Sequence, residues 1–159
     1  MIRSSLVLLT LAASTLLAQG LNPVHWSFSD QNVKAVAGQT VTVHITAEIE
    51  SEWHLYGLRK IEGGPIATTL TIEKGQGFEV AGDVGASPPI TAEDPSFGVR
   101  VDYYLGRVHF ELPVRVAAGT KPGTSTLKVL ARYQMCNDSM CLPPKKVNLE
   151  LPVTIEKSR

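Results

Sequence analysis

The residues with the most evident chemistry are Cys136 and Cys141, the only two cysteines among the 159 residues of the chain. They lie in the segment Tyr-Gln-Met-Cys-Asn-Asp-Ser-Met-Cys-Leu-Pro-Pro (133–144). Asn, Asp and Ser favour turns because their side chains bond to the nearby backbone, and the proline pair ends the segment. We therefore expect a tight, hairpin-like loop between two strands, with the two sulfurs within disulfide distance.

Three chemistries suit such a pair. A structural disulfide that closes so short a loop contributes on the order of 2 kcal/mol. Cu(I) binding could add Met135 and Met140 as soft ligands, but adjacent strand residues point to opposite faces, so Met135 and Cys136 should not reach one ion. Reversible thiol–disulfide exchange needs an accessible sulfur, and the loop holds no Lys, Arg or His to activate it, so the attacking thiolate is expected to come from a partner.

The cellular compartment affects which of these three chemistries is expected, and the first twenty residues indicate export. An apolar run from Leu6 to Ala18 has the length of a signal peptide and is too short to span a bilayer. Small residues before and at Gly20 predict cleavage after that residue, which gives a signal peptide over 1–20 and one mature domain over 21–159. In a periplasmic or otherwise exported compartment the cysteines can pair, and most such pairs are structural.

The charge balance excludes one class of partner. Loss of Arg3 with the signal peptide leaves 14 basic and 15 acidic residues, and 14 − 15 gives a net charge of −1. The chain has no basic block, so we expect no nucleic acid partner. No segment after residue 20 is long and apolar enough to cross a membrane. We expect a soluble protein with no cofactor and no metal.

The elements that position the cysteines are predicted to be strands, because apolar and polar residues alternate and no window has a helical period. Turn signals rich in Gly and Pro separate the segments. We predict an all-β, immunoglobulin-like antiparallel sandwich of about eight or nine strands, and a long surface loop over Val84–Ser96. The expected strands are Val41–Ile49, Val108–Val116, Leu127–Met135, Val147–Ile155, His25–Ser29, Trp53–Tyr56, Ala67–Glu73, Phe78–Val80 and Val99–Leu105.

Several short motifs occur together in a recognisable order. They are Trp-His-Leu-Tyr-Gly (53–57), Gly-Pro-Ile (64–66), Asp-Pro-Ser-Phe-Gly (94–98), Tyr-Leu-Gly-Arg-Val (104–108) and the cysteine segment 133–144. In this order the chain resembles the N-terminal periplasmic domain of the DsbD-type thiol:disulfide reductases. The resemblance covers nearly the whole mature chain, and its most specific part is the cysteine segment with its two prolines.

The resemblance implies an immunoglobulin-like fold and a role as a protein-disulfide reductase component in electron transfer, including cytochrome c biogenesis. Cys136 and Cys141 would be the redox pair, with Cys141 the sulfur that links to a partner. The partners implied are thioredoxin-fold proteins, namely a thioredoxin-like donor and a disulfide isomerase-like acceptor, together with a separate membrane electron transporter. The resemblance further assigns a cap loop and residues that flank the site: Asp94, Phe97 and Gly98 for the cap, and His54, Tyr56, Tyr133 and Pro143 for the flanks.

Two of these positions also have ordinary explanations. Phe97 is either a lid on the disulfide or a core anchor for its loop, since large aromatic residues are usually buried for packing. His54 stands where the family has an aromatic ring, and either tunes a thiolate or is a packing histidine. The loop between the cysteines is one residue shorter than in the best-known members. The alternative functions are a binding or structural module with a structural disulfide and, third, a Cu(I)-binding protein.

Overall fold

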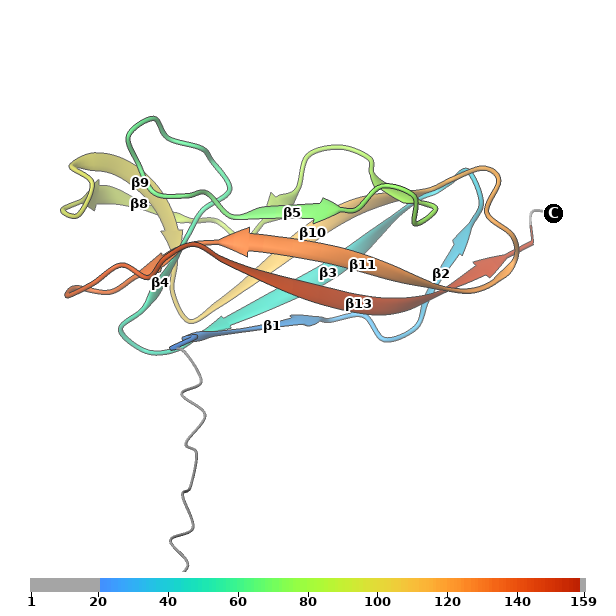
Figure 1. Ribbon diagram of the computed structural model, residues 1–159, viewed down its shortest axis with the longest axis horizontal. Coiled ribbons are helices and arrows are strands. Elements are labelled where there is room, and N and C mark those ends of the chain that lie inside the picture. The colour runs from blue at the N-terminus through green and yellow to red at the C-terminus, as the bar shows by residue number, and fades with distance from the viewer. Residues whose placement is uncertain (1–20, 158–159) are drawn as a thin grey trace, which may run out of the picture.

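The computed structural model describes residues 21–157, so the expected signal peptide lies outside the described residues. Within that range the chain contains thirteen strands and no helix, and therefore no helix that could cross a membrane. The strands form three sheets, two of which stack as a sandwich along the length of the molecule (Figure 1). The predicted all-β, immunoglobulin-like class is confirmed.

The first sheet has the strand order β1-β3-β10-β6, and β7 pairs with the same edge of β10. The long β3 and β10 pair antiparallel over most of their length, which places the alternating apolar residues of both on one face. That face is turned toward the second sheet. The bounds are β1 (Val24–Phe28), β3 (Thr40–Ile49), β6 (Phe78–Val80), β7 (Gly85–Ala86) and β10 (Arg107–Val116).

The second sheet has the strand order β2-β13-β11-β5. β11 and β13 form a long antiparallel hairpin that runs from the pair Gly123 and Ile155 to the pair Tyr133 and Lys145. Beyond this last pair the chain continues into the cysteine loop. The bounds are β2 (Val33–Val36), β5 (Thr69–Ile72), β11 (Gly123–Tyr133) and β13 (Lys145–Glu156).

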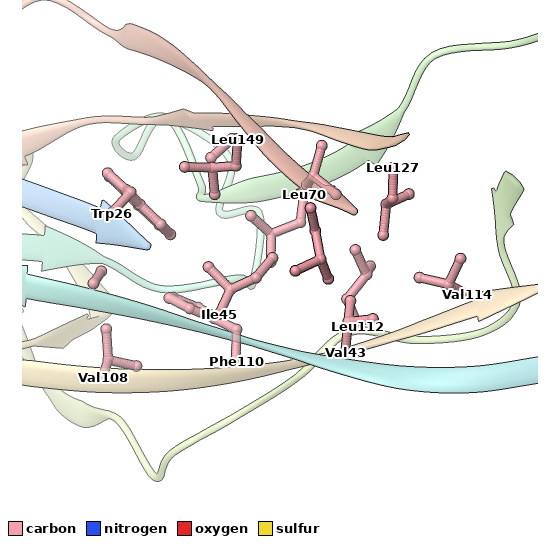
Figure 2. Close-up of a cluster of buried hydrophobic side chains, with 14 of the residues drawn as sticks. Trp26, Val43, Ile45, Leu70, Val108, Phe110, Leu112, Val114, Leu127 and Leu149 are labelled. Carbon is pink, nitrogen blue, oxygen red and sulfur yellow. The ribbon is translucent and has the colours of Figure 1, made fainter. Parts of the chain in front are cut away.

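The core fills the space between these two sheets. Side chains from β3 and β10 face those from β5, β11 and β13, and Trp26 of β1 stacks on Phe110 with ring centroids 5.5 Å apart. Each large apolar side chain that is fully buried contributes about 1.5–3 kcal/mol, so this core makes the sandwich a rigid support. Figure 2 labels Trp26, Val43, Ile45, Leu70, Val108, Phe110, Leu112, Val114, Leu127 and Leu149.

The third sheet, with the order β12-β4-β9-β8, lies at one end of the sandwich, at the left of Figure 1. It carries the cysteine segment because the chain leaves the β11–β13 hairpin at Gln134 and pairs with β4 instead. The Gln134 side chain holds this branch point, since its Oε1 accepts from the Ile66 amide and its Nε2 donates to the Leu142 carbonyl. The bounds are β4 (His54–Tyr56), β8 (Ile90–Asp94), β9 (Val99–Tyr104) and β12 (Met135–Cys136).

The nine expected strands are all present, but the prediction of a surface loop over Val84–Ser96 is wrong. That segment contains β7 and β8, and β8 forms an antiparallel hairpin with β9. β8 is a sheet edge whose residues are mostly exposed on both faces, so it lacks the buried stripe that reveals a strand in sequence. Two other short strands, β2 and β12, were not predicted as separate elements.

Candidate functional site

Cys136 and Cys141 form a disulfide across a tight turn, as their spacing predicts. The two residues face each other as an isolated antiparallel bridge, with Cα atoms 4.0 Å apart. Asn137 shapes the turn, because its Oδ1 accepts from the amides of Ser139 and Met140 and its own amide donates to the Met140 carbonyl. These are the local bonds for which Asn is favoured in turns.

The two cysteine residues differ in their exposure to solvent. Cys136 belongs to β12, lies between β4 and Cys141, and is 0% exposed. Cys141 is at the outer side of the same sheet and is partly exposed. Thiol–disulfide exchange requires an approach to one sulfur from outside, and of the two residues Cys141 is the more exposed.

A small apolar cluster surrounds the disulfide and is separate from the main core. Its buried members are Tyr56, Val101 and Cys136, and Phe97 and Cys141 pack against them while partly exposed. The Phe97 ring meets Tyr56 edge-on, with centroids 5.9 Å apart. The structure therefore brings Phe97 to the group of side chains that holds the disulfide, and its role as a lid remains a prediction.

Asp94 fixes the turn that carries Phe97. This residue ends β8 and is 6% exposed. Its Oδ1 accepts from the Ser96 amide at 2.8 Å, and its carbonyl accepts from the amides of Phe97 and Gly98. Gly98 has a φ of +65°, a conformation that glycine adopts without steric cost.

The same carboxyl group links the turn to β4. The Tyr56 hydroxyl donates to Asp94 Oδ2 at 2.7 Å, in a buried contact that joins β4 to the end of β8. Burial and this hydrogen bond raise the pKa of Tyr56 well above its usual range, so the phenol keeps its proton. The bond ties the position of the turn to the strand that lies beside the disulfide.

His54 lies on β4 directly opposite Cys136 of β12. Its ring packs against Tyr56 and Tyr103, with centroids 5.0 and 5.1 Å away, and its side chain is 19% exposed. Burial lowers the pKa of His54, and this effect outweighs the nearby Asp94 and Asp138, which raise it. The 3.9 Å contact between His54 Nε2 and Asp94 Oδ2 is therefore not an ion pair at neutral pH.

Acidification should destabilise the domain through His54. A histidine whose folded pKa is lowered binds its proton more readily in the unfolded chain, so stability falls as the pH drops below about 6.5, the ordinary histidine value, toward the lowered folded value. One proton contributes at most about 1.4 kcal/mol per pH unit. We expect His54→Phe to lose less stability than the wild type between neutral and mildly acidic pH, as measured by urea unfolding of both proteins. Equal losses would contradict a lowered pKa.

Of the predicted flanking residues, Tyr133 lies outside the disulfide cluster. Tyr133 belongs to the main core, where its ring lies 5.3 Å from that of Trp26 and its hydroxyl donates to Asn22 Oδ1. Pro143 is exposed after the cysteine turn. The structure also contributes Tyr103 and Val101, neither of which the sequence motifs marked. The alternation along Val99–Leu105 places both on one face and is the signal that could have identified them.

A shallow groove of about 380 Å³ opens beside this site. Among residues 21–157 no three His, Cys, Asp or Glu side chains are grouped so that they could hold a metal ion. The groove is lined by Glu52, His54, Glu93, Asp94, Pro95, Val101, Tyr103, Leu105 and Asp138.

The chain is similar to known proteins in sequence and in fold. Residues 27–152 match the family model for the N-terminal domain of the thiol:disulfide interchange protein DsbD. The reduced N-terminal domain of Neisseria meningitidis DsbD has a similar structure, with a TM-score of 0.53 and 18% identity, over 75% of this chain and 82% of that chain. BcpA, the major pilin subunit of Bacillus cereus, gives a TM-score of 0.49 at 11% identity, over 83% of this chain and 40% of that one. No curated protein sequence matches the chain.

Proposed function

Since the chain belongs to the family of DsbD N-terminal domains, whose chemistry is thiol–disulfide exchange, we propose that Cys136 and Cys141 cycle between dithiol and disulfide and pass electrons to thioredoxin-fold proteins. The observation that supports this most directly is the unequal exposure of the two cysteine residues. Cys141 is partly exposed, whereas Cys136 is buried beside it. A purely structural disulfide does not require one exposed and one buried cysteine.

The exchange proceeds in two displacements. The Cys141 thiolate attacks one sulfur of the disulfide in the acceptor protein, which breaks that bond, forms a mixed disulfide and releases the other sulfur as a thiolate. The Cys136 thiolate then attacks Cys141 Sγ, which forms the Cys136–Cys141 disulfide and releases the second sulfur of the acceptor. Two electrons leave the domain, and two protons follow them to the acceptor thiols.

The partners follow from the family and from this chemistry. The acceptor is a disulfide isomerase-like protein, and the domain is reduced again by a thioredoxin-like donor that draws electrons from a separate membrane transporter. The compartment is the periplasm, with residues 21–159 as the mature domain after cleavage of the signal peptide. Each exchange needs a thioredoxin-fold surface that fits around Cys141.

The turn at Asp94–Gly98 acts as a cap over this disulfide. Phe97 shields the sulfurs from small thiols, and a partner displaces the ring when it docks. Asp94 holds the cap in a fixed position relative to β4, because it accepts hydrogen bonds from both the turn amides and the Tyr56 hydroxyl. Shielding of this kind makes exchange depend on the fit of a protein partner rather than on chance collision.

The reduction potential tests the exchange function. We expect the Cys136–Cys141 couple, equilibrated against a thioredoxin of known potential, to lie above about −300 mV, within reach of thioredoxin-fold proteins. The fraction oxidised is measured by mass spectrometry after acid quenching and alkylation. A potential well below that value would instead identify an inert structural bridge.

A further inference from the structure

His54 is the side chain next to Cys136 on the side away from Cys141. The residues His54, Cys136 and Cys141 stand opposite one another on three adjacent chain segments, with Cys136 in the middle. Directly opposed residues of antiparallel strands point to the same face, with Cβ atoms about 5 Å apart. Adjacent strands are about 4.8 Å apart, so His54 neighbours Cys136 and is roughly twice as far from Cys141.

The nitrogen of His54 that faces the interior has no hydrogen-bond partner among the described residues. Nε2 is buried, and the nearest acceptor, Asp94 Oδ2, is 3.9 Å away. A buried polar atom without a partner costs about 1–3 kcal/mol, and such atoms in native structures are often tied to function. If the ring were protonated, Nε2 would carry a proton and the imidazolium could pair with the Asp94 carboxylate.

The titratable groups around the ring are acids and phenols. They come from the segment before β4, β4 itself, the end of β8, β9 and the turn between the cysteines. None of the residues that line the groove is a lysine or arginine. A positive charge on the imidazole would therefore lie near the carboxylates of Asp94 and Asp138 and beside the rings of Tyr56 and Tyr103. Glu52 and Glu93 line the same groove.

Cys136 has a proton to lose and no direct route to solvent. In the reduced domain its thiol must ionise before it can attack the mixed disulfide at Cys141, because the thiolate is the nucleophile. The residue is 0% exposed and sits among apolar side chains, where water cannot solvate a thiolate. The second displacement therefore requires a base close to the Cys136 thiol.

We propose that His54 is this base: its imidazole takes the proton of the Cys136 thiol, and Asp94 stabilises the resulting imidazolium. The proposal rests on the exchange function above and assigns a proton carrier to its second step. The Cys136 sulfur keeps the electron pair of its S–H bond, attacks Cys141 Sγ and forms the intramolecular disulfide. The departing acceptor sulfur leaves as a thiolate and takes a proton from solvent, and the imidazolium releases its proton to solvent through the groove that His54 lines, so charge and protons balance.

The electrostatics of the resting site suit this role. Because burial keeps the pKa of His54 below its ordinary value, the ring is neutral at pH 7 and free to accept a proton. The thiolate that forms beside it favours the charged ring, as Asp94 and Asp138 also do. Thiolate and imidazolium therefore stabilise each other for the short time that both exist.

The two displacements can be timed separately with dithio-bis-nitrobenzoate, a small disulfide that releases a coloured thiolate at each step. With the reduced domain, attack by the first thiol is proportional to reagent concentration. The intramolecular closure by the second thiol is independent of reagent concentration. Stopped-flow absorbance therefore gives one rate for the opening attack and one for the closure by Cys136.

We expect His54→Gln to slow the closure at least tenfold at pH 7 and to change the first attack less than twofold, because general base catalysis typically contributes 10²–10⁴-fold. The difference should shrink at alkaline pH, where the thiol ionises unaided. His54→Phe, which keeps a ring between Tyr56 and Tyr103, should behave in the same way and guards against a packing effect. His25→Gln, on the exposed side of β1, is the matched control.

An unchanged closure rate in both His54 variants, or an equal slowing of both phases, would overturn the assignment of the base. A wild-type domain that shows no closure phase independent of the reagent would overturn the exchange function itself, and the base with it. The experiment thus separates the two failures, and thermal unfolding of each variant verifies that it is folded.

Discussion

The Cys136→Ser variant should accumulate a stable mixed disulfide with a thioredoxin-fold protein. Such a partner is prepared with a single active-site cysteine that is activated as a nitrobenzoate disulfide. Cys141 is partly exposed and can attack it, whereas the residue that would resolve the adduct has lost its sulfur. We expect nearly complete conversion on a non-reducing gel. The wild type should instead release the reduced partner and recover its own disulfide.

The opposite variant, Cys141→Ser, is the matched control. Its remaining sulfur, on Cys136, is fully buried and reacts only after local opening of the site, so adduct formation should be slower by ~100-fold or more. Equal trapping by the two variants would contradict the assignment of Cys141 as the sulfur that meets the partner. Failure of both to form an adduct, in folded proteins, would favour the structural disulfide.

The asymmetry behind this prediction comes from sheet topology rather than from the cysteine spacing. Cys136 is enclosed because it belongs to β12, which is paired with β4 on one side and bridged to Cys141 on the other. Within residues 21–157, the only β-bridge of Cys141 is the one to Cys136. In the proposed exchange, a disulfide at the edge of a small sheet would present one sulfur to a docking partner and keep the other for the closing step.

Most of the sandwich was predictable from sequence because each long strand has one buried face. The stripes along Thr40–Ile49 and Arg107–Val116 alternate strictly, and the structure pairs the two strands over nine residue pairs, from Arg107 with Glu48 to Arg115 with Thr40. β8 was missed for the same physical reason, since an edge strand with little burial carries no stripe. Acidic residues and prolines on such an edge also favour a loop prediction.

The site was predictable only in part. The cysteine pair, its turn and the placement of Phe97 beside it follow from motifs, whereas the separation of Tyr133 from the disulfide does not. Tyr133 precedes the branch at Gln134, so it remains in the main core while Cys136, three residues later, enters another sheet. The contact of Asp94 with both Tyr56 and the turn depends on the β8–β9 hairpin, which the sequence did not predict.

The cap gives the second large effect. In the reduced domain, Phe97→Ala should speed alkylation of Cys141 by iodoacetamide about tenfold, which corresponds to about 1.4 kcal/mol of lost protection. The ring packs in the same cluster as Cys141, and its removal opens that side of the sulfur. The turn itself should persist, because its hydrogen bonds come from the backbone and from Asp94 rather than from the Phe97 side chain.

Ile90→Ala provides the control for this experiment, since Ile90 lies at the far end of the same hairpin, is 44% exposed and is outside the disulfide cluster. It should leave the alkylation rate unchanged. Tyr56→Phe, which removes the bond to Asp94 and keeps the ring, should give a smaller acceleration than Phe97→Ala by loosening the turn. An unchanged rate in Phe97→Ala, together with a lower unfolding temperature, would show that the ring anchors its loop and does not protect the sulfur.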